Sequence, residues 1–137
     1  MKQIEIINAV NTLAGVKINK IKNDKIKFSL IADYRALRKA SRSIDESRQD
    51  VIKKFQEDFA EELEAVQKLR SEGKAVTGHD AFLKAERDVK KVLDQMAQED
   101  CPVEGLTQVS LSDFVKNVSD ADLSMEDIAN LDGIVIE

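Results

Sequence analysis

Residues 29–70 read SLIADYRALRKASRSIDESRQDVIKKFQEDFAEELEAVQKLR and contain neither Gly nor Pro. The apolar side chains of this stretch recur at steps of three, four and seven residues, which places them on one face of an α-helix. That face consists of Leu30, Tyr34, Leu37, Ile44, Val51, Phe55, Phe59, Leu63, Val66 and Leu69. The stretch therefore predicts a long amphipathic helix.

A capping pattern near the middle of this stretch offers an alternative. Ser43 and Glu46 have the Ser-x-x-Glu spacing of a capping box, which would begin a second helix there. Leu37, Ile44 and Val51 keep the same helical phase across that point, so we favour one continuous helix. Such a helix would extend about 60 Å, whereas a compact chain of this length has a radius of gyration of roughly 14 Å. The helix therefore needs a partner helix or must protrude.

The segment that follows predicts that partner helix. Ser71–Gly73 suits the end of the first helix, and Thr77 and Asp80 have capping-box spacing at the start of the next. The second helix would end before Pro102. Its apolar face would consist of Phe82, Ala85, Val89, Val92, Leu93 and Met96. We therefore expect a long antiparallel helical hairpin over residues 29–100.

The expected hairpin predicts which element covers the apolar stripe. The aliphatic side chains between Leu30 and Leu69 should be buried against the helix that follows Gly78. Aromatic residues make up only 4% of the chain and apolar residues 42%, so the core must be built mostly from Leu, Ile, Val and Ala. A core of this kind suits packed helices.

The first 28 residues predict a helix followed by an ambiguous segment. A helix over Lys2–Ala14 is indicated by one apolar face, and Gly15 follows where a C-terminal cap is expected. The apolar positions of residues 16–28 partly alternate around Asn23 and Asp24, which is compatible with a short β-ribbon. A loop leading into the next helix fits equally well, and both alternatives stay open.

Residues 101–137 predict short elements rich in acidic side chains. Ser110 and Ser124 each stand three residues before an Asp, a spacing that caps the start of a short helix. The β-prone segment 134–136 would pair with the ribbon near Ile18 or pack on the hairpin. The whole chain is thus expected to be one mainly α domain, residues 1–137: an N-terminal helix, a long antiparallel hairpin and short C-terminal helices, with a small β-ribbon as the open alternative.

Charge is distributed unevenly along the chain. Residues 1–42 carry ten Lys and Arg against three Asp and Glu, and residues 43–137 carry eleven against twenty-three, within a net charge of −5. A basic segment of this kind favours contact with nucleic acid or with an acidic protein partner. The candidate contact residues are Lys17, Lys20, Lys22, Lys25, Lys27, Arg35, Arg38, Lys39 and Arg42. The acidity of the chain and the absence of interleaved aromatics favour charge complementarity over nucleic acid.

Catalytic chemistry has little support in the sequence. His79 is the only histidine and Cys101 the only cysteine, and no local motif joins either to a nucleophile or a base. Phosphate-binding glycine motifs are also missing. We therefore expect neither an enzyme nor a bound cofactor.

A partial calcium-loop pattern occurs near the C-terminus. Asp120, Asp122 and Ser124 imitate the first ligands of such a loop, but Met125 stands where Gly is needed and Leu131 where Glu is needed. We expect no metal site here.

The chain resembles small helical proteins encoded by bacteriophages and prophages, whose functions are largely uncharacterised. The resemblance is carried by Ile-Asn-Ala-Val-Asn-Thr-Leu-Ala-Gly at residues 7–15, Leu-Ile-Ala-Asp-Tyr-Arg-Ala-Leu-Arg-Lys at 30–39, and Asp-Glu-Ser-Arg-Gln-Asp-Val-Ile-Lys-Lys-Phe at 45–55. It implies an accessory or assembly role in the bacterial cytoplasm and transfers no functional residues.

These patterns predict a non-enzymatic protein that acts through protein–protein interaction. The expected partner is a second copy of the chain or a larger assembly, because the long apolar stripe exceeds what one small domain can cover. Nucleic-acid binding through the basic segment is the alternative. No apolar run approaches the ~20 residues of a membrane span, and Glu5 and Asn8 interrupt the apolar start, so we expect a cytoplasmic protein without a membrane partner.

Overall fold

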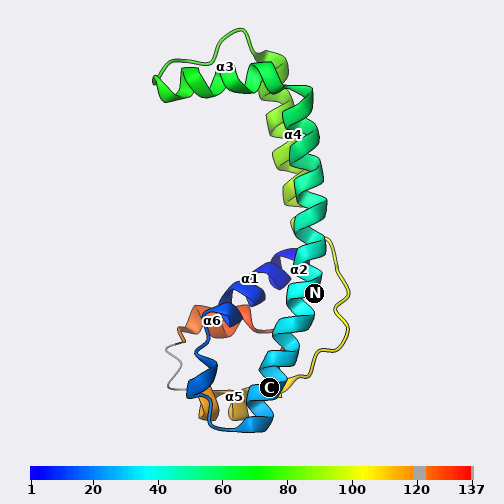
Figure 1. The fold of residues 1–137 in the computed structure, drawn as a ribbon, viewed down its shortest axis with the longest axis vertical. Helices are drawn as coiled ribbons and strands as arrows, with labels where there is room; N and C mark the ends of the chain where they lie inside the picture. Colours follow the sequence, from blue (N-terminus) through cyan, green and yellow to red (C-terminus); the bar gives the residue numbers. More distant parts are fainter. Residues whose placement is uncertain (119–122, 137) are drawn as a thin grey trace. The chain divides into compact units, whose positions relative to one another are not determined.

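A computed structural model describes residues 1–118 and 123–136, and in these residues the protein is mainly helical (Figure 1). Its α-helices are α1 (Gln3–Ala14), α2 (Asp24–Asp58), α3 (Ala60–Ser71), α4 (Asp80–Ala97), α5 (Leu111–Val118) and α6 (Met125–Asn130). A 3-10 helix, η1, covers Ile18–Lys20, and two short strands, β1 (Val109–Ser110) and β2 (Val135–Ile136), form a parallel pair. The predicted fold class is confirmed.

The chain divides into two compact units. The terminal unit comprises Met1–Ile44 and Gln98–Glu137, and the hairpin unit comprises Asp45–Ala97. Helix α2 contributes its first part to the terminal unit and its last part to the hairpin unit. That the two units together form a single domain stays a prediction.

The N-terminal helix begins within one residue of its predicted start. The backbone N–H of Lys2 donates to the Glu5 carboxylate at 2.6 Å, which satisfies a donor at the helix start. The backbone N–H of Gln3 donates to the carbonyl of Glu99 at 2.9 Å, and that of Cys101 donates to the carbonyl of Met1 at 2.7 Å. These bonds fasten the start of α1 to the segment that follows the hairpin.

Residues 16–28 do not form a β-ribbon. They contain η1, a short connection and the start of α2 at Asp24, which is five residues earlier than the sequence pattern predicted. The Asn23 side chain accepts a hydrogen bond from the backbone N–H of Ile26 at 3.2 Å, as expected of a helix N-cap. The Asn-Asp pair therefore starts a helix and does not turn a ribbon, so the loop alternative is the correct one.

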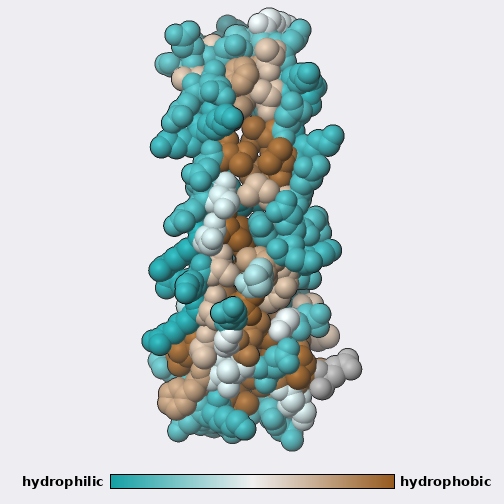
Figure 2. All heavy atoms as spheres, turned by 90° about the vertical axis from the view of Figure 1, so that its right-hand side faces the viewer, coloured by the Kyte–Doolittle hydropathy of each residue, from teal (hydrophilic) through white to brown (hydrophobic). Residues whose placement is uncertain are grey.

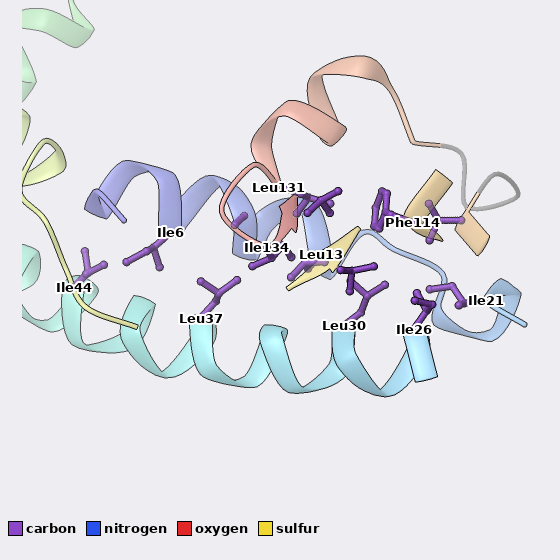
Figure 3. Close-up of a cluster of buried hydrophobic side chains, with 14 residues drawn as sticks. Ile6, Leu13, Ile21, Ile26, Leu30, Leu37, Ile44, Phe114, Leu131 and Ile134 are labelled. Atoms are coloured by element: carbon purple, nitrogen blue, oxygen red, sulfur yellow. The ribbon is translucent and has the colours of Figure 1, made fainter. Parts of the chain in front are cut away.

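The core of the terminal unit is built around the first part of α2 (Figure 3). Leu30 and Leu37 of α2 point towards Leu13 of α1 and towards Ile134 and Phe114 from the C-terminal segments. The buried apolar side chains are Ile6, Ala9, Leu13, Ile21, Ile26, Leu30, Leu37, Ile44, Val109, Phe114, Val118, Leu131, Ile134 and Val135. At about 25 cal/mol per Å² of apolar surface, this burial is the main stabilising contribution in the unit.

This core overturns the predicted partner of the apolar stripe. The stripe was expected to be buried against the helix after Gly78 along its whole length, but Leu30, Leu37 and Ile44 are buried in the terminal unit. Only the part of the stripe beyond Ile44 belongs to the hairpin. Helical periodicity shows that a face is buried, but the covering element comes from a distant part of the chain.

Helix α2 is continuous through Ser43 but ends at Asp58, so the predicted helix to residue 70 is broken. Phe59 has φ −124° and ψ 31°, outside the helical region, and α3 begins directly after it. The break contains neither Pro nor Gly. The Phe59 ring instead packs edge to face on Phe82, with ring centroids 6.0 Å apart, and this contact accompanies the change of direction.

The hairpin unit contains two antiparallel helical segments, as predicted. The Arg48 guanidinium of α2 donates to the carbonyl of Leu93 on α4 at 3.5 Å, and further along α2 the ring of Phe55 lies 5.3 Å from that of Phe82. Higher residue numbers on α2 thus lie beside lower ones on α4. Gly73, in the connection between α3 and α4, has φ +68°, which Gly adopts readily.

The C-terminal helices have the predicted caps. The Ser110 hydroxyl accepts from the backbone N–H of Asp113 at 3.2 Å, and Ser124 and Asp127 form a reciprocal capping box. Strand β2 pairs with β1, Val109 opposite Val135, and not with the segment near Ile18. That segment forms a 3-10 helix and offers no strand edge.

Candidate interaction surfaces

The nine predicted contact residues all belong to the terminal unit. They lie in the connection between α1 and α2 or on the first part of α2. All are exposed except Lys27, which is half-buried: Lys17, Lys20, Lys22, Lys25, Lys27, Arg35, Arg38, Lys39 and Arg42. The structure therefore presents the basic segment to solvent.

Two of these residues contribute to a groove in the terminal unit. The groove has a volume of about 350 Å³ and is lined by Leu13, Ala14, Val16, Ile18, Leu30, Ile31, Tyr34, Arg35 and Arg38. The other seven basic residues do not line it. We call this cavity the arginine groove.

The sequence signal identified the charges of the arginine groove but missed its apolar walls. The sequence pattern places Val16 and Ile18 in a ribbon or loop and Tyr34 on the apolar stripe of the hairpin. The connection after α1 places the first two beside the first part of α2. A clue was available in the apolar residues that alternate with lysines after Gly15.

A second surface lies in the hairpin unit. A shallow trough of about 290 Å³ is lined by Val51, Lys54, Phe55, Asp58, Phe59, Ala85, Asp88 and Val89. On both α2 and α4 the lining residues follow steps of three and four from the first member, Val51 on α2 and Ala85 on α4, so each set lies on one helical face. We call this surface the hairpin trough.

The hairpin trough is mostly apolar with charged margins. In the upper part of Figure 2, apolar side chains gather between hydrophilic ones. Val92, one turn beyond Val89 on α4, is 41% exposed and extends the apolar surface. Within residues 1–118 and 123–136, neither Lys54 nor Asp88 forms an ion pair.

The interior of the hairpin unit is thin. In the part of the chain that the structure describes, Val66 and Phe82 are the only apolar side chains of this unit that are buried. The rings of Phe55 and Phe59, 5.4 Å apart, both contact Phe82 but stay partly exposed. Most of the apolar seam of this unit is therefore only half-buried.

Polar contacts hold the outer part of the hairpin unit together. Arg70 of α3 forms a two-point hydrogen-bonded ion pair with Glu86 of α4, at 2.8 and 3.0 Å. The hydrogen bond from Arg70 lowers the pKa of Glu86. His79 Nδ1 lies 3.3 Å from the Glu62 carboxylate. This contact joins the residue that precedes α4 to α3.

A buried carboxyl group that the sequence analysis did not single out lies in the terminal unit. Asp33 is fully buried, and its Oδ1 accepts from the backbone N–H of Thr107 at 2.6 Å and lies 3.0 Å from the Thr107 hydroxyl. Its Oδ2 has no hydrogen-bond partner among the residues that the structure describes. Burial raises the pKa of the Asp33 carboxyl, although the two hydrogen bonds act in the opposite direction.

The residues considered for metal or redox chemistry are scattered. Cys101 is half-buried and unpaired. In the described ranges, no group of three or more His, Cys, Asp or Glu side chains is arranged to hold a metal ion. Asp120 and Asp122 of the partial calcium pattern lie outside the described residues.

No helix among the described residues has both the length and the apolar character needed to cross a bilayer. Comparisons of the chain with protein-family models, with curated proteins and with solved structures found no match.

Proposed function

We propose that this chain is a non-enzymatic accessory protein that acts through protein–protein interaction and self-associates through the hairpin trough. The observation that supports the proposal is the thin interior of the hairpin unit, with only Val66 and Phe82 buried. A pair of helices that cannot cover its own apolar seam gains stability by packing against another pair, as in a four-helix bundle.

The charges at the trough favour a second copy of the chain as the occupant. Lys54 lies on α2 and Asp88 on α4, and neither has an ion-pair partner within residues 1–118 and 123–136. A two-fold axis parallel to the two helices would place α2 of each copy on α4 of the other and bring Lys54 of each copy towards Asp88 of the other. Such a surface is self-complementary, which is what a symmetric dimer requires.

Light scattering over a concentration series tests this proposal. We expect the apparent mass to rise reversibly from that of a monomer towards a multiple of it. Val92→Glu adds a charge beside the trough and should weaken association about tenfold. Gln49→Glu adds the same charge at an exposed α2 position outside the trough and should leave association unchanged. A wild-type protein that stays monomeric at the highest concentrations would overturn the proposal.

The resemblance to phage and prophage proteins suggests a setting for this role. An assembly factor with a partly exposed apolar helical hairpin would suit the transient protein–protein contacts of phage particle assembly. A phage-type assembly role remains a prediction from that resemblance.

Nucleic-acid binding is the second candidate, and one observation favours it. Although aromatic residues do not alternate with the basic ones, a single exposed aromatic accompanies them: Phe28 on α2 is 65% exposed and available for stacking on a base. Fluorescence anisotropy with a labelled single-stranded oligonucleotide tests this at low and moderate salt. Binding that weakens steeply as salt rises would support the candidate, and no binding at low salt would eliminate it.

A further inference from the structure

The arginine groove combines apolar walls with two cationic side chains. One wall comes from the end of α1 and the following connection, through Leu13, Ala14, Val16 and Ile18, and the other comes from α2. Its volume of about 350 Å³ falls within the ~300–1,000 Å³ typical of small-molecule sites. The cavity is therefore large enough for a small organic molecule.

The two arginines are placed to act on one anion. Arg35 and Arg38 are three residues apart on α2, so their side chains emerge one above the other on the same helical face. Among the described residues, neither guanidinium forms an ion pair or hydrogen bond. Both fork-shaped donor sets are therefore available to a carboxylate, which arginine binds through two parallel hydrogen bonds.

The remaining lining residues select for an apolar body. Leu30 is buried and Val16, Ile18 and Ile31 are half-buried. An apolar ligand chain that lies along them would bury its apolar surface against the protein and away from water, which favours binding. The other basic side chains lie outside the groove, which suits a ligand with one anionic group and not a polyanion. Tyr34 adds one hydroxyl group to this lining.

We propose that the arginine groove binds a small amphipathic carboxylate, with its carboxylate at Arg35 and Arg38 and its apolar chain along the walls from α1 and the connection after it. This site belongs to the terminal unit, so the proposal does not rest on self-association through the hairpin trough. Charge complementarity and the apolar lining together define the ligand class.

Isothermal titration of the full chain with decanoate and with decanol, both below the concentrations at which they aggregate, tests the proposal. The two probes share an apolar chain and differ in the anionic group. We expect saturable binding of decanoate at one molecule per chain, and binding of decanol about tenfold weaker because its neutral hydroxyl cannot form a two-point ion pair with an arginine. Equal affinities for the two probes, or no saturable binding of decanoate, would overturn the proposal.

A matched pair of double variants locates the site. Arg35→Gln with Arg38→Gln removes two charges from the groove and should abolish the preference for decanoate over decanol. Lys25→Gln with Lys39→Gln removes two charges from exposed positions of α2 outside the groove and should preserve that preference. If the two double variants behave alike, the preference arises from overall charge and the proposed site is wrong.

A variant that fills part of the arginine groove tests the proposed position of the apolar ligand chain and leaves both arginines unchanged. Ala14 is exposed at the end of α1 and lines the groove, so Ala14→Phe should occupy the space of the apolar chain with little effect on the core. We expect decanoate binding to weaken about tenfold while circular dichroism and the unfolding midpoint stay close to those of the wild type. Undiminished binding in a folded Ala14→Phe variant would contradict the placement of the chain.

Discussion

The terminal unit and the hairpin unit each cover a part of the same apolar stripe, and they cover it with different elements. The terminal unit covers Leu30, Leu37 and Ile44 with α1 and with C-terminal segments, and its described residues include a core of 14 buried apolar side chains. The hairpin unit covers its part of the stripe with neighbouring helices and buries only Val66 and Phe82. The difference predicts that stability resides mainly in the terminal unit, and it supports the proposal that the hairpin unit associates with a second copy.

The largest expected effect compares one leucine from each unit. Leu37 is fully buried and Leu63 of α3 is half-buried. Leu37→Ala should lower the free energy of unfolding by about 2–5 kcal/mol, because it leaves a cavity in a closed core. Leu63→Ala should lower it by less than half as much at dilute, monomeric concentrations. Urea unfolding measures both, and equal losses would remove the contrast between the units.

A charge exchange sharpens the account of the hairpin trough. Lys54→Asp and Asp88→Lys should each weaken self-association about tenfold, or ~1.4 kcal/mol, because each places like charges opposite one another across the two-fold axis. The double variant restores opposite charges and should recover most of the affinity. Sedimentation equilibrium gives the three association constants. Additive losses in the double variant would show that these side chains do not meet.

The buried carboxyl of Asp33 gives the terminal unit a distinctive pH response. Burial raises its pKa above the ordinary aspartate value of about 3.9, so the folded state binds a proton more tightly than the unfolded state. The contribution of Asp33 to stability is therefore fully present below about pH 4 and is lost as pH rises through the folded-state pKa.

Asp33→Asn isolates this response. The asparagine keeps an oxygen that accepts from Thr107 and removes the buried charge, so at neutral pH we expect a gain of about 1 kcal/mol in the free energy of unfolding. The gain should shrink towards low pH. Chemical unfolding at several pH values measures it, and a difference that grows on acidification would contradict the assigned sign.

The smallest expected effect concerns the exposed pair of Arg70 and Glu86. The pKa of Glu86 is lowered, so its contribution to stability is present above the unfolded pKa of about 4.3 and is lost as pH falls through the folded value. Both side chains are well exposed, and solvent screens the pair. Glu86→Gln should shift the melting temperature by at most about 2 °C at neutral pH in a thermal scan.

The sequence was informative where structure depends on neighbouring residues. Periodicity located the helices, and Ser110 and Ser124 located two helix starts through local hydrogen bonds. Contacts between segments that are distant in the sequence cannot be predicted from such local patterns. The break at Phe59 coincides with a ring contact to Phe82 on another helix, and the pairing of Val109 with Val135 brings together residues that are far apart in the sequence. Neither leaves a pattern in nearby residues.

The candidate sites show the same limit. The basic residues were identified from composition, but only Arg35 and Arg38 line the groove, because its walls depend on how the connection after α1 packs. Asp33 shares the helical phase of Leu30 and Leu37, so its place on the buried face of the helix can be read from the sequence.

Amide hydrogen exchange at low and high protein concentration tests the central contrast most directly. If the hairpin trough carries self-association, exchange of the amides over residues 85–96 of α4 should slow as concentration rises, while exchange in the core helices of the terminal unit stays constant. Exchange rates in α4 that do not depend on concentration, or slowing confined to the terminal unit, would contradict the account.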